Sequence, residues 1–148
     1  MKVLLVRWAQ ASALMPLMQF SVGPWHFDAE AVRLSREASE LHLKFAPYIL
    51  RLANAAPRTG EPILAPLWYH YPADRETYAV TDQFMLGEDV VVAPVLLKGA
   101  RHRDIYLPAG RWREFKTGKE YEGGRWLRDH PALLDTLPVF IRVGAGVI

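Results

Sequence analysis

Three carboxylates of this sequence are placed where hydrolytic chemistry could be sought, but their neighbours indicate structural roles. Asp82 stands before a short apolar run, where an aspartate commonly accepts hydrogen bonds from nearby backbone N–H groups. Glu88 and Asp89 follow Gly87, an arrangement typical of an exposed turn. The spacing of these residues therefore identifies no general acid and base for a hydrolase.

The histidines and serines do not form a recognisable catalytic or metal-binding pattern. The histidines are His26, His42, His70, His102 and His130. No two of them have the i, i+4 spacing of a helical metal site, and no serine lies in a Gly-x-Ser-x-Gly turn. We expect His42 to be a packed or hydrogen-bonded side chain of a helix, and His70 to lie on a strand face. The residues themselves predict no catalytic residue, no metal ion and no cofactor.

Composition limits the classes of partner. The chain has 148 residues, 51% of them hydrophobic, and a net charge of +2 with no block of like charges. Nucleic-acid and membrane-surface binding are disfavoured, because both normally require clustered basic residues. There is no cysteine, and the apolar run after Met1 is too short for a signal peptide, which leaves the compartment unknown with the cytoplasm favoured. The many aromatic side chains could stack on sugars or fill a core.

The pattern of apolar residues changes near residue 60, from helical spacing to short strands. Residues 2–14 predict a helix ended by Pro16, and residues 14–21 predict a short buried strand. Asp28 is the expected N-cap of a long helix that has a kink or break at Pro47 and ends at Pro57 and Gly60. We expect its apolar face to comprise Leu34, Ala38, Leu41, Phe45, Ile49, Leu52 and Ala56.

The second part of the chain predicts a β-sandwich, since short strands alternate with turns that contain glycine and proline. The expected strands are residues 63–71, 83–85, 90–96, 103–107, 111–115 and 137–143. Together these patterns predict an α/β segment at residues 1–61 followed by an all-β domain at residues 62–148.

Several sequence blocks, in order, resemble the region around the end of the catalytic barrel in glycoside hydrolase family 31. The blocks are Arg7-Trp8-x-Gln10, Ala13-Leu14-Met15-Pro16, Phe45-Ala46-Pro47-Tyr48, Thr59-Gly60-Glu61-Pro62-Ile63, Asp82-Gln83-Phe84-Met85-Leu86-Gly87, Val92-Ala93-Pro94-Val95 and Tyr106-Leu107-Pro108-Ala109-Gly110-Arg111-Trp112. The resemblance covers nearly the whole chain. It implies that residues 1–61 are the last strand and helices of an incomplete (β/α)8 TIM barrel, joined to a small antiparallel β-sandwich.

The resemblance also implies retaining hydrolysis of α-glycosides, in which one aspartate forms a covalent glycosyl-enzyme and another acts as acid and then base. In the family both aspartates precede the region matched here, so we expect the catalytic residues upstream and no activity from this chain alone. Both ends look cut, because the chain begins inside an expected helix and stops where the family usually continues.

Gln19, Phe20 and Ser21 are the expected substrate contacts, because they end the expected barrel strand and TIM-barrel active sites lie at such ends. The α-glucosidases of the family typically have Arg-Asn-His at these positions. This difference puts an α-glucosidase assignment in doubt. Residues 19–21 are more similar to those of the branch that contains the myogenesis-regulating glycosidase, which acts on α-galactosides. α-Glucosidase and α-xylosidase activities stay open, and Gln19 and Phe20 could instead pack under the site.

A second hypothesis is a non-catalytic sandwich that binds carbohydrate or supports a partner subunit. An exposed aromatic cluster among Trp68, Tyr69, Trp112 and Trp126 would favour carbohydrate binding, whereas burial of these side chains would leave them a structural role.

Overall fold

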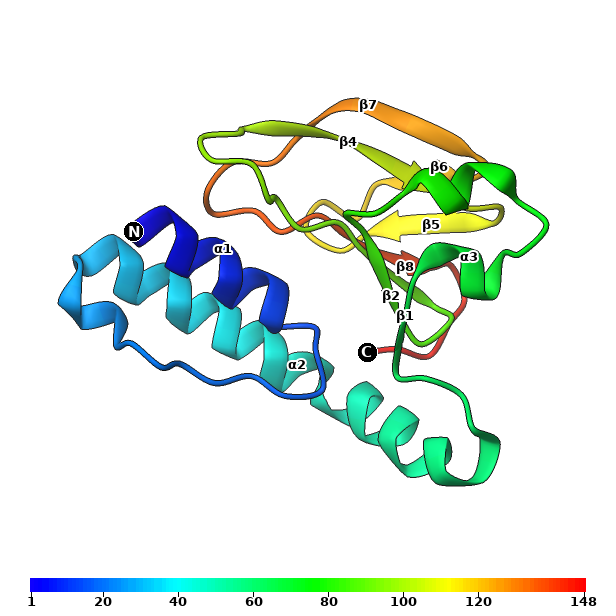
Figure 1. Cartoon of the computed structure of the whole chain (residues 1–148), viewed down its shortest axis with the longest axis horizontal. Helices are drawn as coiled ribbons and strands as arrows, with labels where there is room; N and C mark the ends of the chain where they lie inside the picture. Colours follow the sequence, from blue (N-terminus) through cyan, green and yellow to red (C-terminus); the bar gives the residue numbers. More distant parts are fainter.

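Two helices form the N-terminal part of the computed structural model, which describes residues 1–148 (Figure 1). Helix α1 spans Lys2–Ser12, a 3-10 helix η1 spans Pro24–His26, and helix α2 spans Ala29–Thr59. The prediction of the α2 N-cap is confirmed, since Asp28 Oδ1 accepts a hydrogen bond of 2.8 Å from the Ala31 N–H. Gly60 ends the helix with a φ of 74°, a left-handed conformation that favours glycine.

Helix α2 runs without a break past Pro47, and Pro57 lies inside it. The alternative of a break at Pro47 is therefore wrong, while a kink there stays a prediction, and of Pro57 and Gly60 only Gly60 ends the helix. Pro47 is exposed, while Phe45 and Ile49 on either side of it are buried against the sandwich. The lost backbone hydrogen bond thus faces water, and packing holds the helix together on the other side.

The segment 14–21 is irregular, and the expectation of a strand there is wrong for this structure. No strand of either sheet lies beside it, and a single strand cannot satisfy its own backbone groups. Leu14 is fully buried, whereas Met18 packs on the small side chains where α1 meets α2. The segment is thus held by side-chain packing.

The second part of the chain forms two antiparallel sheets. The strands are β1 (Leu64–Ala65), β2 (Phe84–Leu86), β3 (Val90–Val92), β4 (His102–Leu107), β5 (Arg111–Glu114), β6 (Glu120–Glu122), β7 (Arg125–Pro131) and β8 (Val139–Arg142). One sheet has six strands in the order β1-β2-β3-β8-β5-β6, and the other pairs β4 with β7. A small antiparallel β-sandwich is thus confirmed, together with helices that pack on it.

The strand expected at residues 63–71 is wrong, because strand β1 contains two residues and the short helix α3 (Leu67–His70) follows. Pro66 separates them: it cannot donate to a strand ladder and it sits at the N-cap of α3. A second 3-10 helix, η2, spans Arg75–Ala79. Strands β6 and β7 escaped prediction because charged residues occupy much of both.

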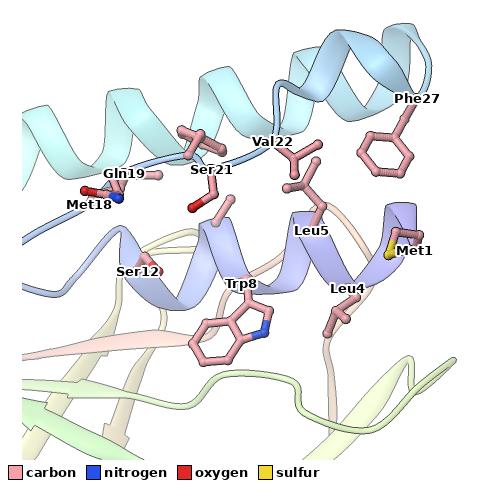
Figure 2. Close-up of a pocket in the computed structure, with 12 residues that line it drawn as sticks. Met1, Leu4, Leu5, Trp8, Ser12, Met18, Gln19, Ser21, Val22 and Phe27 are labelled. Carbon is pink, nitrogen blue, oxygen red and sulfur yellow. The ribbon is translucent and has the colours of Figure 1, made fainter.

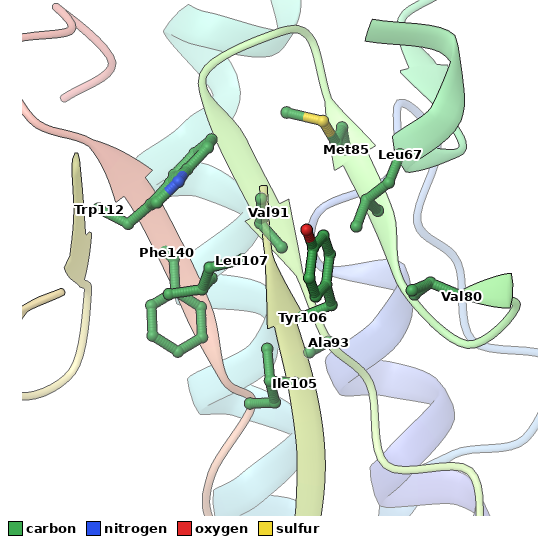
Figure 3. Packing of buried hydrophobic residues seen from close by; sticks show 10 residues of the cluster. All are labelled: Leu67, Val80, Met85, Val91, Ala93, Ile105, Tyr106, Leu107, Trp112 and Phe140. Atoms are coloured by element: carbon green, nitrogen blue, oxygen red, sulfur yellow. The ribbon is translucent and has the colours of Figure 1, made fainter. Parts of the chain in front are cut away.

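The core of the sandwich lies between the two sheets, where Trp112 and Phe140 are fully buried beside strands β3 and β4 (Figure 3). A second buried cluster joins α2 to the outer face of the large sheet, through Phe45, Tyr48 and Ile49. The helices are therefore attached to the sandwich by a continuous apolar contact, which fixes where residues 14–28 lie.

Candidate functional site

Gln19, Phe20 and Ser21 are brought together on one groove between α1 and the irregular segment (Figure 2). The groove has a volume of about 600 Å³. Its lining residues are Met1, Leu4, Leu5, Trp8, Ala9, Ser12, Met18, Gln19, Phe20, Ser21, Val22 and Phe27. All three expected substrate contacts are exposed to solvent there.

The groove is apolar and contains few polar groups. Its polar side chains are the amide of Gln19 and the hydroxyls of Ser12 and Ser21, and none of its side chains is ionisable. General acid–base catalysis needs a group that exchanges a proton near neutral pH. These residues can therefore contact and orient a ligand, but they supply no acid or base.

A buried arginine positions α1, which forms one wall of the groove. The Arg7 guanidinium donates to the backbone carbonyls of residues 100, 132, 133 and 136 at 2.8–3.3 Å, and Gln10 Nε2 donates to the Leu134 carbonyl at 2.6 Å. We call this set the Arg7 clamp. Burial lowers the pKa of Arg7, and the nearby Asp135 opposes that shift. The clamp escaped prediction, although an Arg and a Gln three residues apart on an apolar helix were its signal.

Two histidines that the sequence singled out have structural surroundings. His42 Nδ1 lies 2.9 Å from the Ala13 carbonyl oxygen, which confirms a hydrogen-bonded helix position. His70 lies in α3, so the expectation of a strand face is wrong. Its Nε2 atom is buried without a hydrogen-bond partner, and burial is the main reason that the pKa of His70 is lowered.

The carboxylates around Gly87 also have partners on the scaffold. Asp82 Oδ1 lies 2.9 Å from the Arg103 guanidinium, an ion pair rather than the expected contact with local backbone N–H groups. Asp89 Oδ1 accepts from Arg142 Nε at 3.1 Å. Burial lowers the pKa of Arg103, and Asp82 opposes that shift. Both acids thus hold neighbouring segments of the sandwich together.

One buried acid–histidine pair could not be found from the sequence. His130 Nε2 lies 2.9 Å from Glu114 Oε1, while the other carboxylate oxygen accepts from the Thr117 hydroxyl at 2.6 Å. In a nucleophilic triad the hydroxyl would donate to the histidine, whereas here it donates to the carboxylate. The pair therefore joins β5 to β7 across the two sheets and lacks the order of a hydrolytic site.

The aromatic residues divide between core and surface. Trp112 is fully buried and Trp126 is half-buried. Trp68 and Tyr69 are exposed, at 42% and 40%. Two of the four aromatic residues that we singled out are therefore available to a ligand.

The structure adds two observations on other kinds of site. No three or more of its His, Asp and Glu side chains lie close enough together to hold a metal ion. None of its helices combines the length and the apolar character that crossing a membrane requires.

Comparison with known proteins gives a consistent set of relatives. Residues 60–147 match the glycosyl hydrolase family 31 C-terminal domain. The myogenesis-regulating glycosidase of Mus musculus is 41% identical over 93% of this chain and 19% of its own length. The SITS-binding protein of Tetronarce californica is 38% identical over 94% of this chain and 20% of its own length.

Solved structures show the same similarity. A family 31 dextranase of Flavobacterium johnsoniae, solved with isomaltotriose, has a TM-score of 0.89 and 39% identity over 98% of this chain and 19% of its own. A family 31 alpha-xylosidase from a soil metagenome, solved with xylose, has a TM-score of 0.91 and 31% identity over 99% of this chain and 25% of its own. The chain thus spans about a fifth to a quarter of the length of these relatives.

Proposed function

Because the chain belongs to glycoside hydrolase family 31, we propose that it forms the C-terminal part of a retaining α-glycoside hydrolase. The observation that carries this proposal is the extent of the structural likeness. It covers 98–99% of the chain, and thus includes α1 and α2 as well as the sandwich. The substrate is then an α-linked sugar, and the family resemblance expected from the sequence blocks is confirmed.

Residues 1–61 then belong to the catalytic barrel, and residues 62–148 form the sandwich that follows it. The exposed apolar side chains of the first segment support this division. They include Leu4, Trp8, Leu17, Val22 and Trp25. Leu4, Trp8 and Val22 line the same groove, and exposed apolar side chains gathered in this way are typical of a face that another part of the protein covers. Segment 14–21 would pair as a strand once its barrel neighbours lie beside it.

In this arrangement the chain supports the reaction and contacts the sugar, while two carboxylates from the rest of the barrel perform the chemistry. Retaining hydrolysis needs these carboxyl groups about 5–5.5 Å apart, one as nucleophile and one as acid and then base. The groove side chains around Gln19 are not ionisable, which agrees with a role in orientation. The Arg7 clamp holds α1, and hence the groove wall, against the sandwich.

Gln19, Phe20 and Ser21 are our candidates for the sugar contacts. The Gln19 amide can donate to one hydroxyl and accept from another, the Ser21 hydroxyl can do the same, and the Phe20 ring can lie against apolar C–H groups. Ser21 is small where α-glucosidases of the family carry a histidine, so we favour an α-galactoside as the substrate. The alpha-glucosidases among the relatives keep a glucoside as the alternative.

A chimera tests this function. The chain would replace the corresponding C-terminal region of the Flavobacterium dextranase, with which it is 39% identical. We expect a folded chimera that hydrolyses nitrophenyl α-glycosides, in which Gln19→Ala or Ser21→Ala raises KM. The matched control is Asn54→Ala, because Asn54 is an exposed amide side chain of α2 that does not line the groove, and this change should leave KM unaltered.

The isolated chain provides the converse measurement. We expect no hydrolysis of nitrophenyl α-glycosides by the purified chain, because its groove contains no ionisable side chain. Turnover that persists through further purification and falls in the Glu114→Gln variant would refute the proposal, since it would place the reaction on the Glu114–His130 pair.

A further inference from the structure

A pair of stacked aromatic rings lies on the surface of the sandwich, where α3 meets η2. The ring centroids of Trp68 and Tyr78 are 6.0 Å apart, and their planes differ by 12°. Both side chains are exposed, at 42% and 55%. A large part of both rings is therefore in contact with water, outside the hydrophobic core. Exposed aromatic surface of this kind is typical of a binding site.

The geometry of the pair leaves ring faces uncovered. Atoms of fully overlapped rings approach to about 3.5–4 Å, so near-parallel rings with centroids 6.0 Å apart must be offset. Each ring of Trp68 and Tyr78 thus shares only part of its face with the other. Together they form a stepped apolar surface, which we call the Trp68–Tyr78 plate.

The plate is held in place before any ligand binds. The Tyr78 hydroxyl donates to the Pro72 carbonyl at 3.0 Å, which fixes one ring. Trp68 is flanked by Tyr69 with centroids 6.5 Å apart, and the Tyr69 hydroxyl donates to Glu61 Oε2 at 3.0 Å. A fixed aromatic surface loses little side-chain entropy on binding, which favours recognition of weakly interacting ligands.

The two short helices that carry the plate also carry hydrogen-bond donors. Arg75 precedes Tyr78 by three residues in η2, and side chains three residues apart in a 3-10 helix lie on the same side. Arg75 is exposed, and its guanidinium forms no ion pair within the chain. The indole N–H of Trp68 is a further donor at the edge of the plate.

We propose that Trp68, Tyr78 and Arg75 form a binding surface for an α-linked oligosaccharide chain. One face of a pyranose ring is made of C–H groups and suits an aromatic surface, while its hydroxyls accept hydrogen bonds from the guanidinium and the indole N–H. The choice of ligand class rests on the proposed function. Figure 1 places α3 far along the long axis from α1, so this surface is separate from the groove at Gln19–Ser21.

Affinity electrophoresis of the 148-residue chain tests the proposal, in native gels that contain dextran, starch or galactomannan. We expect at least one of these polysaccharides to slow the wild-type chain. Trp68→Ala and Tyr78→Ala should each weaken binding about tenfold or more, whereas Trp68→Phe should retain most of it. Trp25→Ala is the matched control, because Trp25 is an exposed tryptophan at 72% whose ring neighbour is His26.

Three results would overturn the proposal: no retardation of the wild-type chain by any of the three polysaccharides, unchanged retardation of both plate variants, or an equal loss in Trp25→Ala. Thermal melts of each variant show whether a loss of binding comes from unfolding, and Tyr78→Ala provides a second reading if Trp68→Ala is unstable. The chimera separates the two proposals. Hydrolysis without plate-dependent retardation contradicts this inference alone, whereas retardation without hydrolysis contradicts the proposed function alone.

Discussion

Replacing Arg7 by alanine should destabilise the protein more than the loss of any surface ion pair. Arg7 is 9% exposed and its guanidinium donates to four backbone carbonyls, those of residues 100, 132, 133 and 136. A hydrogen bond from a charged group contributes roughly 1.5–3 kcal/mol. The four do not add fully, because the substitution also removes the cost of burying the charge.

We therefore expect Arg7→Ala to lower the free energy of unfolding by about 3–5 kcal/mol, the range found when one partner of a buried charged contact is removed. Arg7→Lys keeps the charge but offers three donors in place of five, and should cost about 2 kcal/mol. The control is Arg33→Ala, since Arg33 pairs with Glu37 on the exposed face of α2. That change should stay within about 0.5 kcal/mol.

Urea denaturation followed by circular dichroism measures the three differences, and hydrogen exchange locates them. In Arg7→Ala we expect faster exchange of the amides in α1 and in segment 132–136, with the strands of the large sheet less affected. The reasoning would be refuted if Arg7→Ala and Arg33→Ala had equal free energies of unfolding. It would also fail if exchange in segment 132–136 did not change.

Three further predictions concern the sandwich. Gln83→Leu should lower the free energy of unfolding, measured by urea denaturation, by about 2–3 kcal/mol. The buried Gln83 amide accepts a hydrogen bond from the Tyr106 N–H at 2.8 Å and donates one to the Tyr106 carbonyl at 2.9 Å. Gln83→Glu should lower the free energy of unfolding further, since a carboxylate cannot donate to that carbonyl. Gly87→Ala should lower the free energy of unfolding by about 3 kcal/mol, because φ is +57° and an added Cβ would clash with the Tyr48 hydroxyl. Gly118→Ala should lower it by only about 1–2 kcal/mol, because φ is +74° but the added Cβ would meet open space. Equal melting temperatures of the two variants would contradict this prediction. The free energy of unfolding of the wild type, relative to that of His70→Phe, should fall as pH falls below about 6.5. Burial lowers the pKa of His70, so in this range the unfolded chain binds a proton that the folded chain does not. A difference between the two proteins that does not change between about pH 5 and 8 would contradict this prediction.

The sequence was sufficient for the parts of the fold that are governed by local patterns. The N-cap at Asp28 and the apolar face of α2 were both readable, because each depends on residues within a few turns of one another. Segment 14–21 was not, since its apolar run suggested a strand but no strand of either sheet lies beside it to pair with. Pro66 shows a similar limit. A proline ends a strand, which could be read from the sequence, but the apolar residues on both sides of Pro66 suggested one continuous strand instead of β1 followed by α3.

The candidate site follows the same division. Gln19, Phe20 and Ser21 were selected from the family resemblance; the structure places them on one groove, and their contact with a sugar stays a prediction. The Glu114–His130 pair could not be predicted, because 16 residues and a change of sheet separate its members. Spatial pairs of this kind have no signature in the spacing of a single sequence.

The position of β8 has a consequence for synthesis on the ribosome. Strand β8 is translated after every other strand of these two sheets, yet it lies between β3 and β5 and hydrogen-bonds to both. Until residues 139–142 leave the exit tunnel, β1-β2-β3 and β5-β6 cannot join into one sheet, and their inner edges stay open. The large sheet can therefore form only after β8 has been made, and a chain truncated before residue 139 would expose two half-sheets prone to pair with other chains.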